Sequence, residues 1–191
     1  MRPQVALLDD VFAAGLVKDY SLAVDGGANV GDWTAKLLEQ FECVYAIDAA
    51  QVCVDFLDER FPPGMGVKIT HAALLSGAAR VRVVSPNKKP FSQKRYVAFD
   101  DSGDTMGFTI DSLKLKSCGL IKLDLEGAEG LALLGARETI AKFRPVLIVE
   151  FFREQSRRYG HSENDVLNIV RSFGYREALS SYPDKVFVHG D

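Results

Sequence analysis

Hydrophobic positions in the first part of the chain switch between helical spacing and short continuous runs. Apolar residues between positions 4 and 18 recur at helical spacing, and the short apolar runs that follow are typical of buried strands. The predicted strands are Leu22–Asp25, Val44–Asp48 and Val67–Ala72, and the predicted helices are Asp32–Phe41 and Val52–Phe61. This alternation predicts a mainly parallel sheet with helices on both faces.

The alternation breaks between Ala79 and Lys116 and then resumes. Three β-rich pieces, Arg80–Ser85, Arg95–Phe99 and Met106–Ile110, predict a hairpin-like insertion (79–117) and a short connector. The later elements are predicted at Leu120–Leu125 (strand), Ala128–Phe143 (helix), Pro145–Phe152 (strand), Glu163–Phe173 (helix) and a terminal hairpin of Glu177–Ser181 and Lys185–His189. We expect one domain over residues 1–191, with an N-terminal helix in residues 1–20.

Composition narrows the class of protein. The 191 residues are 47% hydrophobic and 26% charged, as in an ordinary globular domain. The net charge of -3 argues against a protein whose main role is to grip nucleic acid. Cys43, Cys53 and Cys118 form no C-x-x-C pair, which argues against a disulfide framework or zinc cluster. We expect a cytoplasmic protein without membrane contact, since no signal-peptide pattern or bilayer-length apolar run occurs.

A glycine-rich turn, D-G-G-A-N-V-G at residues 25–31, joins the first predicted strand to the first helix. Gly27 and Gly31 let the backbone approach a ligand closely. A dinucleotide site would need glycine at position 28, where Ala28 stands. Asp25 would repel a pyrophosphate but attract the sulfonium and ammonium groups of S-adenosylmethionine (SAM). The turn therefore favours the methyl donor over NAD.

Asp48 ends the second predicted strand, 23 residues after Asp25, which is close to the spacing of a ribose-binding acid. One carboxylate can accept both ribose hydrogen bonds. The alternative is that Asp25 and Asp48 only cap helices. We favour the cofactor interpretation, because acid, glycines and second acid occur in the expected order.

Four further segments carry a family resemblance: I-K-L-D-L-E-G-A-E at 121–129, L-G-A at 134–136, R-P-V-L-I-V-E at 144–150 and T-I-D-S-L at 109–113. Together with the glycine turn, they resemble the FkbM family of SAM-dependent methyltransferases. The resemblance implies a Rossmann-like class I methyltransferase fold: an α/β domain with a mainly parallel seven-stranded sheet and a C-terminal antiparallel hairpin. It also implies O-methylation of a hydroxyl on a sugar or natural product. The expected donor-binding residues are Asp25, Gly26, Gly27, Ala28, Asn29, Gly31, Asp48, Ala49, Ala72 and Asp124.

Asp124 is the leading candidate for the chemistry. Ligands bind at the carboxyl ends of strands in open α/β sheets, where Asp124 and Glu126 are expected to lie on one side. A neutral hydroxyl is a poor nucleophile, so we expect Asp124 to act as base or orienting carboxylate, with Glu126 as its partner. His161 is a further candidate base, although a lone histidine is more often structural. For Glu129 we favour a structural role at the next helix N-terminus.

Lys122 stands in an otherwise apolar strand and is expected to pair with Asp124 or Glu150. Glu150 fits equally well as an acid of the pocket or as that partner. No spaced set of metal ligands occurs. We therefore favour a metal-free site over a Mg²⁺ ion held by Asp124, Glu126 and substrate oxygens.

Other functions are less favoured but stay open. An amino-group methyltransferase acting on nucleic acid would carry Asp/Asn-Pro-Pro-aromatic where this chain has Asp-Leu-Glu-Gly at 124–127, and no Pro-Cys nucleophile is present. A protein methyltransferase and an inactive donor-binding module are the remaining alternatives. The expected partner is a small-molecule or glycan acceptor.

Overall fold

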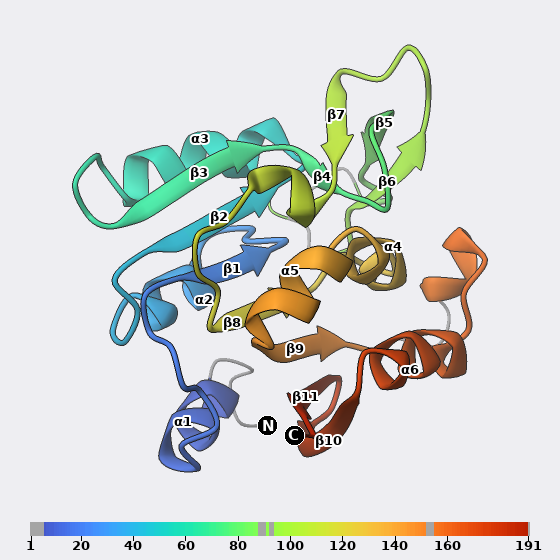
Figure 1. Ribbon diagram of the computed structural model, residues 1–191. Coiled ribbons are helices and arrows are strands. Elements are labelled where there is room, and N and C mark those ends of the chain that lie inside the picture. Colours follow the sequence, from blue (N-terminus) through green and yellow to red (C-terminus); the bar gives the residue numbers. More distant parts are fainter. Residues whose placement is uncertain (1–5, 88–90, 92–93, 152–154, 191) are drawn as a thin grey trace.

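The computed structural model describes residues 6–87, 91, 94–151 and 155–190, and its large sheet has the order β10-β11-β9-β8-β1-β2-β3 (Figure 1). These strands are β1 Ala23–Gly26, β2 Val44–Asp48, β3 Val67–His71, β8 Leu120–Leu123, β9 Val146–Glu150, β10 Tyr175–Ser181 and β11 Asp184–His189. The central strands pair in parallel, whereas β11 runs antiparallel to β9 and β10. The predicted fold class is confirmed.

Helices cover both faces because strand residues alternate in direction. The helices are α1 Ala6–Ala13, α2 Asp32–Leu37, α3 Gln51–Arg60, α4 Glu129–Leu134, α5 Arg137–Phe143, α6 Glu163–Ser172 and the 3₁₀ helices η1 Ile110–Leu113 and η2 Ser156–Tyr159. Ala23 and Leu120 belong to the hydrophobic cluster of α1 and α2. Their neighbours Val24 and Ile121 belong to the cluster of α4, α5 and α6 on the other face.

The helix predicted over 128–143 is wrong: the chain forms α4 and α5, with a break at Gly135. A Cβ at Gly135 would lie 2.1 Å from the backbone oxygen of Leu75, so the chain here touches another backbone. The carboxylate of Asp111 then accepts the amides of Glu138 (3.0 Å) and Thr139 (2.8 Å), which begins a new helix. Both causes are tertiary contacts. The predicted helix 32–41 is also too long, since α2 ends at Leu37.

The predicted hairpin insertion is part of a second sheet of four strands, in the order β4-β7-β5-β6. Its strands are β4 Ala73–Leu74, β5 Ala79–Val84, β6 Tyr96–Phe99 and β7 Thr105–Phe108. β5 pairs antiparallel with both β6 and β7, and β4 joins β7 in parallel. In Figure 1 this second sheet stands beyond the carboxyl ends of β1 and β2, where a ligand site is expected.

A capping box begins α6. The Ser162 hydroxyl accepts the Asp165 amide at 3.2 Å, and the Asp165 carboxylate accepts the Ser162 amide at 2.7 Å. We expect Ser162→Ala to lower the free energy of unfolding by about 1 kcal/mol in urea denaturation. Ser172→Ala, at the exposed end of the same helix, is the control and should change it by less than about 0.5 kcal/mol. Equal effects of the two changes would contradict the capping role.

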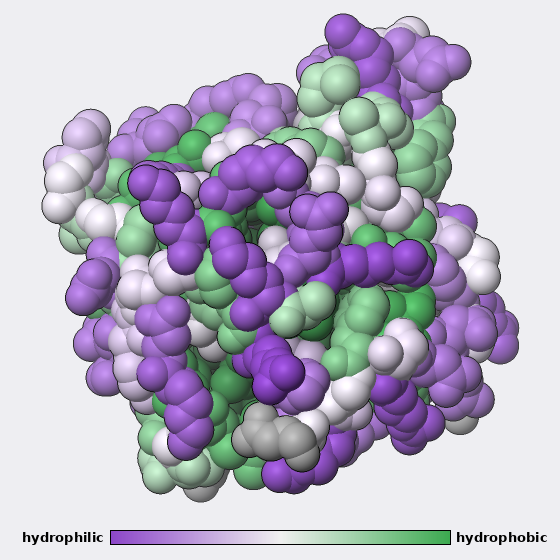
Figure 2. Space-filling view, viewed as in Figure 1, coloured by the Kyte–Doolittle hydropathy of each residue, from purple (hydrophilic) through white to green (hydrophobic). Residues whose placement is uncertain are grey.

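No helix within the described ranges is long and apolar enough to cross a bilayer. Hydrophilic side chains are spread over the face in Figure 2, with apolar residues visible between them. The predicted helix start at residues 4–5 and the predicted strand end at Phe152 lie outside the described residues.

Candidate active site

A cavity of about 650 Å³ lies between the carboxyl edge of the large sheet and the second sheet. Of the predicted site residues, it is lined by Gly27, Ala28, Asn29, Asp48, Ala49, Ala72, Asp124 and Glu126. Its wall also includes Glu150, Gln155, Val83 and residues 94–97. The predicted residues Asp25, Gly26, Gly31 and His161 are not among its lining residues.

The glycine turn depends on left-handed backbone angles, with φ of 76° at Gly27, 49° at Asn29 and 80° at Gly31. A Cβ at Gly27 would lie 1.9 Å from the carbonyl oxygen of Asp124. Only glycine therefore permits the ends of β1 and β8 to meet this closely. The result is a turn whose residues Gly27–Val30 form one wall of the cavity.

Asp48 holds this turn in place. Its two carboxylate oxygens accept the backbone amides of Asn29 and Ala50, each at 2.8 Å. Burial raises the pKa of Asp48, and the two amide hydrogen bonds act in the opposite direction. Each carboxylate oxygen has a second lone pair, so two acceptor positions remain. The capping interpretation and a ribose-binding role are therefore compatible.

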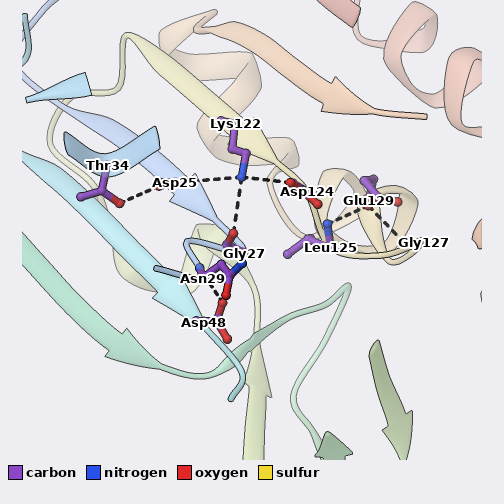
Figure 3. A network of polar contacts seen from close by, with 10 residues as sticks. All are labelled: Asp25, Gly27, Asn29, Thr34, Asp48, Lys122, Asp124, Leu125, Gly127 and Glu129. Carbon is purple, nitrogen blue, oxygen red and sulfur yellow. Dashed lines mark hydrogen bonds and ion pairs between the residues drawn. The ribbon is translucent and has the colours of Figure 1, made fainter. Parts of the chain in front are cut away.

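Asp25 is fully buried and its charge is compensated inside the protein (Figure 3). Its Oδ2 accepts the Thr34 hydroxyl at 2.6 Å, and its Oδ1 lies 3.3 Å from Lys122 Nζ. Lys122 Nζ also lies 3.6 Å from Asp124 Oδ2, one of the two partners expected for it. The pairing with Asp25 was missed, although Asp25 and Lys122 are direct register partners on β1 and β8. Asp25 thus lies outside the cavity lining, at the strand end that precedes the glycine turn.

Lys122 is 1% exposed and lies between α2 and the cavity, with its Nζ 5.4 Å from the Trp33 ring centre. Burial by itself lowers the pKa of Lys122, but the nearby carboxylates together raise it by more than burial lowers it. The pKa therefore lies above its ordinary value. The carboxylates responsible are Asp25, Asp124, Asp184 and Glu150. Lys122 therefore remains positively charged at neutral pH.

Three carboxylates, Asp124, Glu126 and Glu150, meet at the cavity, with one oxygen of each within 4.8 Å of the others. Burial and the neighbouring charge of Asp124 raise the pKa of Glu150 to about 10. The same two causes raise the pKa of Glu126 to about 7. Gln155 Nε2 donates to Glu126 Oε2 at 2.5 Å. The sequence left Glu150 undecided, and the structure places it in the cavity wall.

Glu129 and His161 lie behind this group. Glu129 Oε1 accepts the amides of Leu125 (2.7 Å) and Gly127 (3.1 Å), in agreement with its predicted structural role. His161 packs against α4, so that a Cβ at Gly130 would lie 2.8 Å from its Nδ1. The structure therefore does not bring His161 to the predicted base position.

The wall built by the second sheet was not predicted. Arg95 Nη2 donates to Asn29 Oδ1 at 2.9 Å, which joins this wall to the glycine turn across 66 residues of sequence. On the opposite side, the Tyr159 hydroxyl donates to the Val97 carbonyl at 2.7 Å and accepts the Val97 amide at 3.2 Å. No local pattern indicates either contact, because both join distant segments.

Comparisons with known proteins give one family-domain match and several structures of similar fold. The Methyltransferase FkbM domain model matches residues 101–177. A methyltransferase FkbM from Methylobacillus flagellatus KT shares the fold with a TM-score of 0.63 and 19% identity, over 93% of this chain. This chain spans only 46% of that protein. No curated protein matches the chain significantly in sequence.

Two further structures have the same fold at similar length. An rRNA methylase from Streptococcus thermophilus matches with a TM-score of 0.55 and 13% identity, over 98% of this chain and 96% of its own. Magnesium protoporphyrin IX methyltransferase from Synechocystis, solved with bound SAM, matches with a TM-score of 0.53 and 15% identity, over 97% and 77%. The domain match and the shared fold agree with the resemblance drawn from the motifs: residues 101–177 match the FkbM methyltransferase domain, and the chain has the fold of class I methyltransferases.

Proposed function

We propose that the protein transfers a methyl group from SAM to a hydroxyl oxygen of a sugar or small natural product. The observation that carries the proposal is the cavity itself, in which the glycine turn and Asp48 face one region and Asp124, Glu126 and Glu150 another. When bound, SAM supplies an electrophilic methyl group on a positively charged sulfur.

The residues present fit that donor. Asp48 keeps two acceptor positions for the ribose hydroxyls. Ala49 and Ala72 offer small apolar surfaces beside it, which suit an adenine ring. The carboxylates at the other end favour the sulfonium and ammonium charges. Asp25 contributes indirectly, because its charge is paired with Lys122.

We propose that Asp124 removes the proton of the acceptor hydroxyl or orients this hydroxyl. It follows β8 directly, lies at the cavity surface and is 26% exposed, whereas Lys122 beneath it is almost fully buried. Alignment of the methyl donor with the acceptor accounts for much of the rate enhancement of a displacement reaction. A nearby base that removes the hydroxyl proton contributes a further factor of about 10²–10⁴. Lys122 holds Asp124 in place through its ammonium group.

A small neutral acceptor suits the charge of the cavity better than a nucleic acid. Three carboxylates at its surface would repel a phosphate backbone, and the net charge of -3 provides no compensating basic excess. The cavity volume of about 650 Å³ is also in the usual range for small-molecule sites. Because relatives of the same fold include an rRNA methylase and a porphyrin methyltransferase, the acceptor must be tested directly.

Calorimetry with SAM, S-adenosylhomocysteine and NAD⁺ tests the donor. We expect both sulfur compounds to bind and NAD⁺ not to bind. Asp48→Ala should weaken S-adenosylhomocysteine binding about 10- to 100-fold, since it removes hydrogen bonds to a charged group. Asp58→Asn, on the exposed side of α3, is the matched control and should bind normally. Binding of NAD⁺ in place of SAM would overturn the proposal.

Transfer from tritiated SAM to a panel of sugars, glycosides and hydroxylated natural products, with ribosomal and transfer RNA alongside, tests the acceptor. We expect the label in a small molecule as an O-methyl group, with Asp124→Asn slower by about 100-fold or more. Label in RNA would contradict the proposed acceptor, and donor binding without transfer to any class would indicate a binding module.

A further inference from the structure

Two neighbouring parallel strands bring three acidic side chains to one point. Asp124 and Glu126 follow β8, and Glu150 ends β9 beside it. One carboxylate oxygen from each residue lies within 4.8 Å of the other two, and all three side chains line the cavity. Neighbouring acids alone do not make a metal site. The surroundings of each carboxylate must also indicate whether a cation binds there.

Glu150 shows that this group is incomplete. It is only 5% exposed, and its Oε2 atom is buried without a hydrogen-bond partner among the described residues. A buried carboxylate oxygen without a partner is unfavourable. Lys122 is a buried cation of the same region, but its ion pairs are with Asp25 and Asp124. The geometry leaves a place for a cation beside Glu150.

Distances and chemistry define the kind of cation. Two oxygens on one ion are separated by at most twice the metal–oxygen distance, about 4.2 Å for Mg²⁺ and about 4.6–5.2 Å for Ca²⁺. The 4.8 Å limit is within the calcium range and needs only a small side-chain movement for Mg²⁺ or Mn²⁺. A set of carboxylate oxygens without sulfur or imidazole selects these hard cations over zinc.

Supporting contacts already orient one of the ligands. Gln155 Nε2 donates to Glu126 Oε2, which leaves Oε1 of Glu126 available. The left-handed backbone at Glu126, with φ of 55°, turns the chain at this point, and Arg158 donates to its carbonyl oxygen at 3.0 Å. Such outer contacts are typical of metal ligands that are fixed before the ion binds.

We propose that Asp124, Glu126 and Glu150 bind one hard divalent cation of the Mg²⁺, Mn²⁺ and Ca²⁺ class. Its remaining coordination positions face the cavity, where water or acceptor oxygens would occupy them. This inference departs from the metal-free site expected from the sequence. It goes beyond the proposed methyl transfer and does not depend on the identity of the methyl donor.

Mn²⁺ is the probe for the test. The full chain, freed of metal with EDTA and kept without methyl donor, is titrated with Mn²⁺ and followed by electron paramagnetic resonance of the free ion. We expect one bound Mn²⁺ per chain, displaced by Ca²⁺ or Mg²⁺. Glu150→Gln and Glu126→Gln should each weaken binding by about 10-fold or more. Glu59→Gln, an exposed carboxylate on α3, is the matched control and should bind as the parent does.

Circular dichroism of each variant identifies those that have folded, and two independent ligand variants keep the test decisive if one does not fold. Absence of bound Mn²⁺ at millimolar concentration, or binding as tight as that of the parent in folded Glu126→Gln and Glu150→Gln, would overturn the site. S-adenosylhomocysteine binding is measured on the same samples. Donor binding without Mn²⁺ rejects the metal site alone, whereas Mn²⁺ binding without donor binding supports it and rejects the proposed function.

Discussion

Replacement of Lys122 by methionine is expected to lower the free energy of unfolding by about 3–5 kcal/mol. Lys122 Nζ lies 3.3 Å from Asp25 Oδ1, and these side chains are 2% and 0% exposed. Methionine keeps much of the aliphatic volume but removes the ammonium group. Among the described residues, Asp25 would then retain only its hydrogen bond from Thr34, as a buried carboxylate without a counter-ion. Denaturation in urea at neutral pH measures the loss.

Two comparisons separate the charge effect from the change in packing. Lys185 pairs with Glu177 at the same 3.3 Å but near the surface, so Lys185→Met should change stability by less than about 1 kcal/mol. Adding Asp25→Asn to Lys122→Met should restore part of the lost stability, because the unpaired charge is removed. If Lys122→Met and Lys185→Met unfold at the same urea concentration, burial of the pair is not what makes it important.

Gly27→Ala is expected to remove more than about 4 kcal/mol of stability and to abolish S-adenosylhomocysteine binding in any folded fraction. The added Cβ would lie 1.9 Å from the Asp124 carbonyl oxygen, at a residue whose φ is 76°. The Asp124 amide is itself bonded to the Gly26 carbonyl at 3.1 Å, so the two strand ends can separate only by breaking their pairing. Thermal unfolding and calorimetry measure the two effects.

Gly77→Ala is the matched control for this change. Gly77 is exposed, its backbone is not left-handed, and no atom lies within 4 Å of an added Cβ. Its stability should change by less than about 0.5 kcal/mol, with normal donor binding. A Gly27→Ala variant that binds S-adenosylhomocysteine as well as Gly77→Ala does would show that the turn tolerates a side chain.

The parts of the fold that depend on local patterns could be predicted from the sequence. Apolar runs located the central strands, and the glycine turn with Asp48 located one end of the cavity. These features are set by a few consecutive residues, so neighbouring side chains suffice to indicate them. Asp124 and Glu126 line the cavity as expected, but they follow the end of β8 at Leu123 instead of belonging to the strand predicted to reach Leu125, so alternation along the strand is not what places them.

Other features depend on partners that are distant in the chain. The break between α4 and α5 follows from the contact of Gly135 with the Leu75 backbone. The second sheet requires β4 to pair with β7, and no periodicity within either strand specifies that pairing. The partner of Asp25 becomes evident only when β1 and β8 are known to be neighbours. Local patterns alone do not specify such long-range contacts.

The second sheet has a small hydrophobic cluster of its own, formed by Ala73, Leu75, Val81 and Val97, separate from the three clusters that pack against the large sheet. Changes in this cluster can therefore reshape one side of the cavity without directly altering the clusters that pack against the large sheet, whereas a change at Arg95 would also reach the glycine turn through Asn29. Under the proposed function, substitutions in this cluster are expected to change the preference for the acceptor more than the binding of the donor.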